Sequence, residues 1–195
     1  MNIAQLLRIV ELHDPATRVH LENVRDGCYR LGRAMGYKDG HAEAIAEAGL
    51  LHDVGKLHVP NFVLSKPARL DPHEFTIVKY HPEQGAELAT RVNRKRLAMW
   101  IELHHERLDG TGYPRGLTAE FIPREVQLLT VVDVFDALSA PRPYRAERTM
   151  KESINELHSE VTVGRLNGEM VQAYLEIIGA PSAVPAYDLR ATLVG

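Results

Sequence analysis

Seven side chains of the types that bind divalent metal ions lie along the chain, two from aspartate and five from histidine. They are His20, His52, Asp53, His81, His104, His105 and Asp133. Imidazoles and carboxylates in this ratio are how proteins hold a pair of hard-to-borderline divalent ions that activate water. The pattern indicates a metal-dependent hydrolase.

Taken singly, several of these residues have an ordinary structural explanation. A lone histidine on a helix, such as His20 or His81, is more often a hydrogen-bonded core or surface residue than a ligand. The pair His52 and Asp53 is more specific, because apolar neighbours predict that both are buried and a buried carboxylate without a cation is costly. Lys56 follows one helical turn after His52, so its ammonium can reach the same pocket.

Asp133 lies within the apolar stretch 123–140, which is expected to be a helix through the core. A metal ion would stabilise a carboxylate there, whereas an unpaired one would be strongly destabilising. Asp136, one turn later, either holds a ligand histidine or a substrate group, or forms a cap or salt bridge near the helix end. Adjacent His104 and His105 cannot both lie on one face of a helix. Both can therefore bind in one metal cluster only if the cluster lies off the end of their helix and the backbone turns there.

Composition bounds the protein class. A chain of 195 residues with 45% hydrophobic residues and a net charge of -3 predicts one domain, without the charge imbalance of a protein that binds long nucleic acid. The lone Cys28 cannot form an internal disulfide, and neither an export signal nor an apolar run of about 18 residues is present. We therefore expect a cytoplasmic protein that does not enter a membrane.

Helical signals cover most of the chain and strand signals are almost absent, which predicts an all-α bundle of about seven helices. Helices are expected over 3–12, from Asp14 and Pro15 to Gly36, over 41–52, from Asp71 and Pro72, from Pro82, and over 94–105, 123–140, 149–158 and 167–178. The apolar face of the first helix (Ile3, Leu6, Leu7, Val10) either packs on its own domain or forms a homodimer or docks a regulatory partner.

Three segments carry a family resemblance: LLHDVGK, the stretch HHERLDGTGYP from His104 to Pro114, and VVDVFDALSAPRPYR. Together they closely resemble the HD-GYP family, a branch of the HD-domain metal phosphohydrolases that act on cyclic dinucleotides. The resemblance runs from about Asp14 to about Leu175. It implies an N-terminal helical extension over 1–13, an HD-GYP domain over 14–178 and a loose tail over 179–195.

The resemblance implies two divalent ions, iron first and manganese second. The ligands it implies for one ion are His20, His52, Asp53 and Asp133, and for the other His81, His104 and His105 with Asp53 as a bridge. Lys56 and Asp53 are the expected catalytic residues. The expected substrate contacts are Lys56, Asp109, Gly112, Tyr113, Asp136, Arg142 and Arg145. Without the resemblance, the two arginines would be assigned to a solvated loop.

The implied reaction is hydrolysis of cyclic di-GMP to linear pGpG, with GMP formed only slowly. Some family members bind a third metal through a glutamate four residues before the first ligand histidine, a position that Ala16 occupies here. Smaller departures fall at His58, Val132 and the segment 166–168. The alternatives are a cyclic-dinucleotide sensor with little catalysis, or a general HD-type nucleotidase. The complete ligand set and Tyr113 favour the cyclic-dinucleotide phosphodiesterase.

Overall fold

The computed structural model describes residues 1–139 and 149–180, and within them the chain forms helices and no strand, which confirms the predicted all-α class. Seven helices have ten or more residues: α1 (Ile3–His13), α2 (Pro15–Ala34), α3 (Asp39–Leu51), α6 (His81–Arg91), α8 (Arg124–Ser139), α9 (Met150–Thr162) and α10 (Gly168–Ile177). The shorter elements are α4 (Asn61–Leu64), α5 (Pro72–Lys79), α7 (Ala98–Leu103) and the 3-10 segments η1 (Val54–His58), η2 (Lys95–Leu97) and η3 (Ala119–Phe121). Arg142, Arg145 and the tail from residue 181 lie outside the described residues.

Helix starts follow the capping residues that the sequence singles out. The Asp14 side chain accepts a hydrogen bond from the backbone N–H of Ala16, with a proline in the first turn of α2. Asp71 caps α5, and Glu74 returns a hydrogen bond in a capping box. Both starts are therefore fixed by local hydrogen bonds.

The helix predicted over 94–105 is wrong at both ends. The chain forms η2 and then α7, which ends at Leu103. His104 and His105 thus both lie beyond the helix, and the backbone turn that a shared cluster requires is present.

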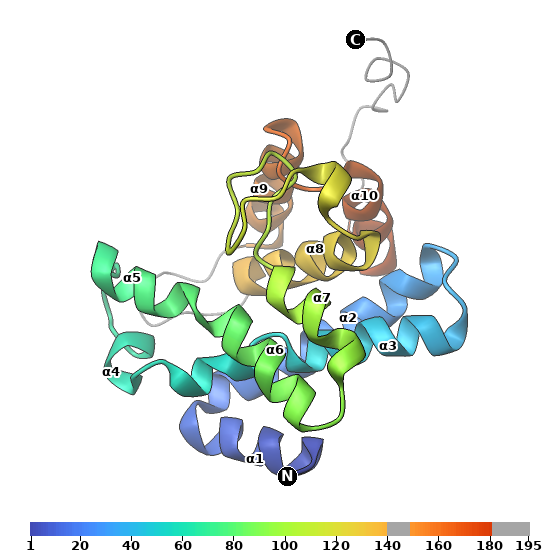
Figure 1. The fold of residues 1–195 in the computed structure, drawn as a ribbon. Helices are drawn as coiled ribbons and strands as arrows, with labels where there is room; N and C mark the ends of the chain where they lie inside the picture. The colour runs from blue at the N-terminus through green and yellow to red at the C-terminus, as the bar shows by residue number, and fades with distance from the viewer. Residues whose placement is uncertain (140–148, 181–195) are drawn as a thin grey trace.

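The centre of the fold is formed by α2, α3 and α8, with α9 and α10 above them and α1 below in the view of Figure 1. Val24 and Leu31 of α2, Ile45 of α3, and Leu129 and Val132 of α8 are all fully buried in one apolar cluster. Packing of these helices sets His20 on α2 opposite Asp133 on α8.

The apolar face of α1 packs on its own domain. Leu6, Leu7 and Val10 are buried and belong to the same core cluster as α2 and α8. A dimer or partner contact through this helix stays a prediction, and it would have to use the opposite side, where Ile9 and Leu12 are exposed. None of the described helices combines the length and the hydropathy that crossing a membrane requires.

Candidate metal centre

All seven predicted ligands meet at one place in the fold. They form two groups whose ligand atoms lie within 4.8 Å of one another: His20, His52 and Asp133, and next to them Asp53, His81, His104 and His105. The first group joins α2, the end of α3 and α8, whereas the second joins the start of η1, the start of α6 and the turn after α7. Neither group could form from one segment alone.

The first group is a compact triangle of ligand atoms. Nε2 of His20 lies 3.1 Å from Oδ1 of Asp133 and 3.2 Å from Nε2 of His52. Nε2 of His52 lies 3.4 Å from the same Asp133 oxygen. One cation could contact all three atoms.

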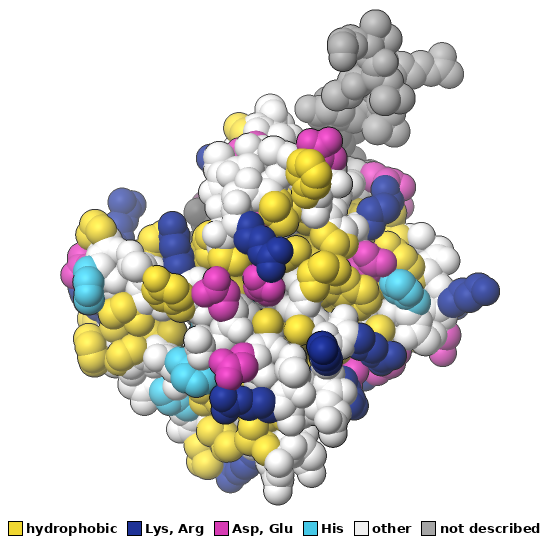
Figure 2. All heavy atoms as spheres, viewed as in Figure 1, with side chains coloured by type: hydrophobic (Ala, Val, Ile, Leu, Met, Phe, Trp, Pro, Cys, Tyr) yellow, Lys and Arg dark blue, Asp and Glu magenta, His cyan; other side chains and the backbone are white. Residues whose placement is uncertain are grey.

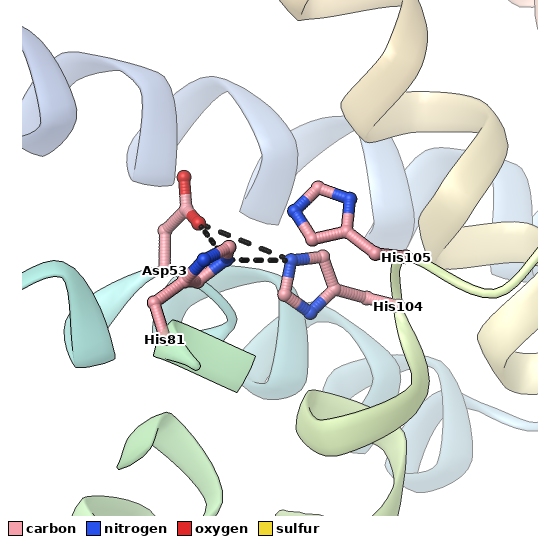
Figure 3. Close-up of side chains that lie close together, drawn as sticks. All are labelled: Asp53, His81, His104 and His105. Carbon is pink, nitrogen blue, oxygen red and sulfur yellow. Dashed lines mark hydrogen bonds and ion pairs between the residues drawn. The ribbon is translucent and has the colours of Figure 1, made fainter. Parts of the chain in front are cut away.

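Asp53 stands between the two groups and turns one oxygen to each. Its Oδ1 lies 2.9 Å from Nε2 of His81 and 3.9 Å from Nε2 of His104, contacts that Figure 3 shows with the His105 ring beside them. Its Oδ2 lies 3.6 Å from Nε2 of His20 and 3.5 Å from Nε2 of His52. This is the geometry expected of a carboxylate that bridges two ions.

Three of the histidines are oriented by the helix that precedes each of them. Their Nδ1 atoms lie 2.7 Å from a carbonyl oxygen three residues earlier: His52 from Gly49 in α3, His81 from Val78 in α5 and His104 from Ile101 in α7. These carbonyls lie in the last turn of their helices, where carbonyl oxygens are open to hydrogen bonds from side chains. Each ring therefore places its proton on Nδ1 and leaves a lone pair on Nε2.

The donor set fits a divalent cation. In this tautomer Nε2 of His81 has no proton to give to Oδ1 of Asp53, and that buried oxygen accepts no hydrogen bond from any described residue. Unprotonated nitrogen and carboxylate oxygen therefore face each other inside the protein, an arrangement that repels unless a cation lies between them. Each of the two groups could therefore hold a metal ion.

Burial and charge keep the groups in the protonation states that metal binding needs. Burial and the neighbouring His52 and His81 lower the pKa of His104 to about 3, and burial with the adjacent His104 holds the pKa of His105 well below its usual value. Burial would raise the pKa of Asp53, but Lys56 and the histidines outweigh it and lower that pKa well below the usual value. His104 and His105 are therefore neutral and Asp53 is charged, as metal ligands must be.

His20 differs from the other histidines because acids flank it on both sides. Burial by itself lowers its pKa, yet hydrogen bonds with Asp133 and Asp136 outweigh that effect and raise the pKa to about 10. Nδ1 of His20 lies 2.6 Å from Oδ2 of Asp136. This contact favours the first explanation of Asp136, in which it holds a ligand histidine.

A close backbone contact holds the bridging aspartate against α6. A Cβ atom at Gly55 would overlap the carbonyl oxygen of His81 and lie 2.5 Å from the backbone nitrogen of Gly85. Only a glycine lets η1 lie this close to the start of α6. The same segment carries Lys56, whose Nζ lies 2.5 Å from Oδ2 of Asp53 because 3-10 winding aligns residues three apart.

Tyr113 in the glycine-rich loop covers the second group. Its ring centroid lies 4.7 Å from that of His105, and its backbone N–H donates to the carbonyl of His105. A Cβ atom at Gly112 would lie 2.5 Å from Cα of Glu106, so the loop can fold back on the turn after α7 only with glycine there. Gly112 and Tyr113 of the predicted loop therefore lie beside the second group.

Glu106 holds this loop in place, and the sequence argument did not identify it. Its side chain is 2% exposed, and its two oxygens accept hydrogen bonds from the backbone N–H groups of Arg115 at 2.7 Å and Leu117 at 2.9 Å. The role of this glutamate could not be predicted from the sequence. Its partners are main-chain N–H groups about ten residues away, and every residue type except proline has such a group.

We expect Glu106→Gln to loosen the loop, because a glutamine amide turns an N–H toward one of the two backbone donors. A lost buried hydrogen bond of about 1–3 kcal/mol would speed amide hydrogen exchange at Arg115 and Leu117 about 5- to 150-fold. Glu102→Gln is the matched control, since Glu102 contacts only the Arg115 side chain. Equal protection of both amides in Glu106→Gln and the parent would contradict this role.

One predicted substrate residue, Asp109, is engaged by other residues of the loop. Asp109 accepts hydrogen bonds from the backbone N–H and hydroxyl of Thr111 and lies 3.3 Å from Nε of Arg165, so its carboxylate is engaged within the loop. Its contact with substrate stays a prediction. The same holds for the two arginines at 142 and 145, outside the described residues.

Comparison with known proteins agrees with this geometry. The family model described as "HD domain" matches residues 4–170, starting within the segment assigned to an N-terminal extension. The chain is 34% identical over 172 residues to "3'3'-cGAMP-specific phosphodiesterase 1" of Vibrio cholerae. The aligned region covers 87% of this chain and 40% of the relative. It is 37% identical over 171 residues to "Cyclic di-GMP phosphodiesterase" of Thermotoga maritima, covering 86% of this chain and 46% of the relative. The chain thus spans less than half the length of these curated relatives.

Solved structures share the fold. Bd1817, an HDG"Y"P protein from Bdellovibrio bacteriovorus, has a TM-score of 0.68 at 21% identity, covering 83% of this chain and 52% of that one. The HD domain of the L. monocytogenes phosphodiesterase PgpH, solved with cyclic-di-AMP, also has a TM-score of 0.68, at 16% identity over 94% of this chain and 100% of that one. With the family match and the curated relatives, the chain belongs to the HD domain family and to its HD-GYP branch.

Proposed function

We propose that this chain is a metal-dependent phosphodiesterase that hydrolyses cyclic di-GMP to linear pGpG. The observation that carries the proposal is Asp53, whose two buried oxygens face two groups of imidazoles. The names of the curated relatives support a cyclic dinucleotide as substrate.

Each residue near the centre has a role that its contacts support. Bound divalent ions supply Lewis acidity toward water and a phosphodiester. Lys56, paired with Asp53, adds positive charge where a phosphate would collect negative charge. Tyr113 shields His105 from solvent, and Asp136 orients His20. Mixed imidazole and carboxylate ligation suits iron or manganese as well as zinc, and the family resemblance favours iron first and manganese second.

A second candidate substrate is 3'3'-cGAMP, since three of the curated relatives are named as phosphodiesterases specific for it. The purified chain should be loaded with iron or manganese, assayed for metal by mass spectrometry and incubated with both cyclic dinucleotides. Chromatography of the products then identifies the preferred substrate. Binding without cleavage would indicate a sensor, and cleavage of mononucleotides alone would indicate a general nucleotidase.

The position of Ala16 leads to a prediction about products. A methyl group cannot bind a metal ion, so we expect two ions per chain and no third site to hold a new terminal phosphate. Linear pGpG should therefore accumulate, with GMP appearing slowly, in a chromatographic time course. Rapid, complete conversion to GMP at low enzyme, or three ions per chain, would contradict it. Ala16→Glu should speed the second cleavage if the glutamate alone is missing.

A further inference from the structure

The rim of the metal centre carries an aromatic and basic pair that the ligand groups do not use. Phe75 and Lys79 lie one turn apart on α5, which stands at the edge of the molecule in Figure 1. Nζ of Lys79 lies 4.9 Å from the centre of the Phe75 ring and 5.4 Å from the centre of the Tyr113 ring. The Phe75 ring meets Tyr113 edge-on at 6.3 Å. Through Tyr113 and His105, this pair adjoins the second ligand group.

The pair is not part of the core. No residue of α5 is buried, and the Phe75 side chain is 44% exposed. Figure 2 shows hydrophobic and basic side chains next to each other over α4 and α5. The ring is therefore accessible to a ligand beside the site.

The charge of Lys79 is available to a ligand. Among the described residues no carboxylate lies within ion-pair distance of it, whereas Lys66 on the same side of the molecule is paired with Glu74. Two aromatic rings hold the ammonium through cation–π contacts. A flat apolar face and an unpaired cation side by side match a purine base that carries acceptor atoms on its edge and a phosphate nearby.

The α5 helix is also fixed in place, as a recognition element requires. The Asp71 and Glu74 capping box sets its start, and Nζ of Lys66 lies 2.6 and 2.8 Å from the two oxygens of Glu74. Phe75 follows directly, so the ring is presented by an anchored turn. Little ordering entropy remains to be lost on binding.

We propose that Phe75 and Lys79 bind the purine base of the second nucleotide of the cyclic dinucleotide, the one whose phosphodiester is not being cut. Phe75 stacks on the base, and Lys79 contacts its acceptor edge or the adjoining phosphate. This inference rests on the proposed function, because it assigns a subsite to the same substrate. Neither residue contacts a ligand atom of the metal groups, so both act on affinity and substrate choice.

The test separates affinity from turnover. Phe75→Leu and Lys79→Met should each raise the KM for the preferred cyclic dinucleotide about 5- to 150-fold, the range expected for loss of a base–aromatic stack or of a base-edge contact. The kcat should stay within about twofold and the metal content unchanged, because the reacting phosphate is held elsewhere. Phe75→Trp and Lys79→Arg, which keep the flat ring and the charge, should stay near the parent. Phe121→Leu on η3, where the ring is 65% exposed, is the matched control.

A binding measurement keeps this inference distinct from the proposed function. Calorimetric titration of the metal-loaded protein with a non-hydrolysable phosphorothioate analogue of cyclic di-GMP should show the same loss of affinity in Phe75→Leu and Lys79→Met. If the parent binds the analogue through these residues but cleaves no cyclic dinucleotide, the proposed function fails and the subsite stands. Parent-like KM and affinity in both variants, an equal loss in Phe121→Leu, or no binding by the parent would overturn the subsite.

Discussion

Asp53→Ala should remove both metal ions from the protein. The two oxygens of this carboxylate face the two ligand groups, and without it the second group keeps imidazoles alone, which supply no negative charge to balance a dication. Loss of a partner that only orients a ligand already weakens metal binding about 10- to 100-fold, so removal of a shared ligand should exceed that. Metal content per chain, measured by mass spectrometry after dialysis, should fall to background, and phosphodiesterase activity with it.

The matched control is Asp26→Ala, an aspartate on α2 whose side chain is 73% exposed and pairs only with Arg25 at the surface. It should retain two ions per chain. Circular dichroism separates loss of metal from loss of fold in Asp53→Ala. A folded Asp53→Ala protein that keeps two ions and full activity would show that the centre is assigned to the wrong residues.

Gly55→Ala should disrupt the centre through the backbone, without touching the side chain of any ligand. The added methyl meets main-chain atoms of His81 and Gly85, which no side-chain rotation can move. Overpacking of this kind costs about 1–3 kcal/mol or more, which corresponds to a fall in Tm of about 2–4 °C per kcal/mol for a chain of this size. Because η1 and α6 must separate, Asp53 moves away from His81, and we expect the second ion to be lost first.

Gly40→Ala is the control for this substitution, since a Cβ atom at Gly40 in the first turn of α3 has no neighbour within 4 Å. Its Tm should be equal to the parent's or slightly higher, because alanine favours the helix. Calorimetry gives both Tm values, and metal analysis gives the occupancy. If Gly55→Ala matches Gly40→Ala in both measurements, the close contact between η1 and α6 is not needed for the centre.

The parts of the structure that the sequence predicts are those determined locally. Asp14 and Asp71 mark helix starts because a cap acts on N–H groups two or three residues away. The apolar neighbours of Asp133 predict its burial for a similar reason, since they share its helix. The seven ligand candidates could therefore be named, and the two sets that the family resemblance implies, with Asp53 shared, correspond to side chains that lie together in the structure.

The parts that could not be predicted depend on contacts between distant segments. The fit of Gly55 against His81 and Gly85 requires that η1 and α6 be placed first, and no local pattern marks it. Glu106 is hidden for the same reason, because its partners are backbone N–H groups. Phe75 and Lys79 fall on an ordinary helical spacing, and only the nearby Tyr113 ring makes them notable.

The way the histidines are oriented has an evolutionary consequence. His52, His81 and His104 donate to main-chain carbonyls of Gly49, Val78 and Ile101, and every amino acid presents such a carbonyl. Point substitutions at those three acceptor positions leave the acceptor in place, so drift there is harmless to ring orientation as long as the helix ends persist. His20 depends instead on a side chain, Asp136. Among these four rings, only His20 can lose or change its hydrogen-bond partner through a single substitution, the one that replaces Asp136.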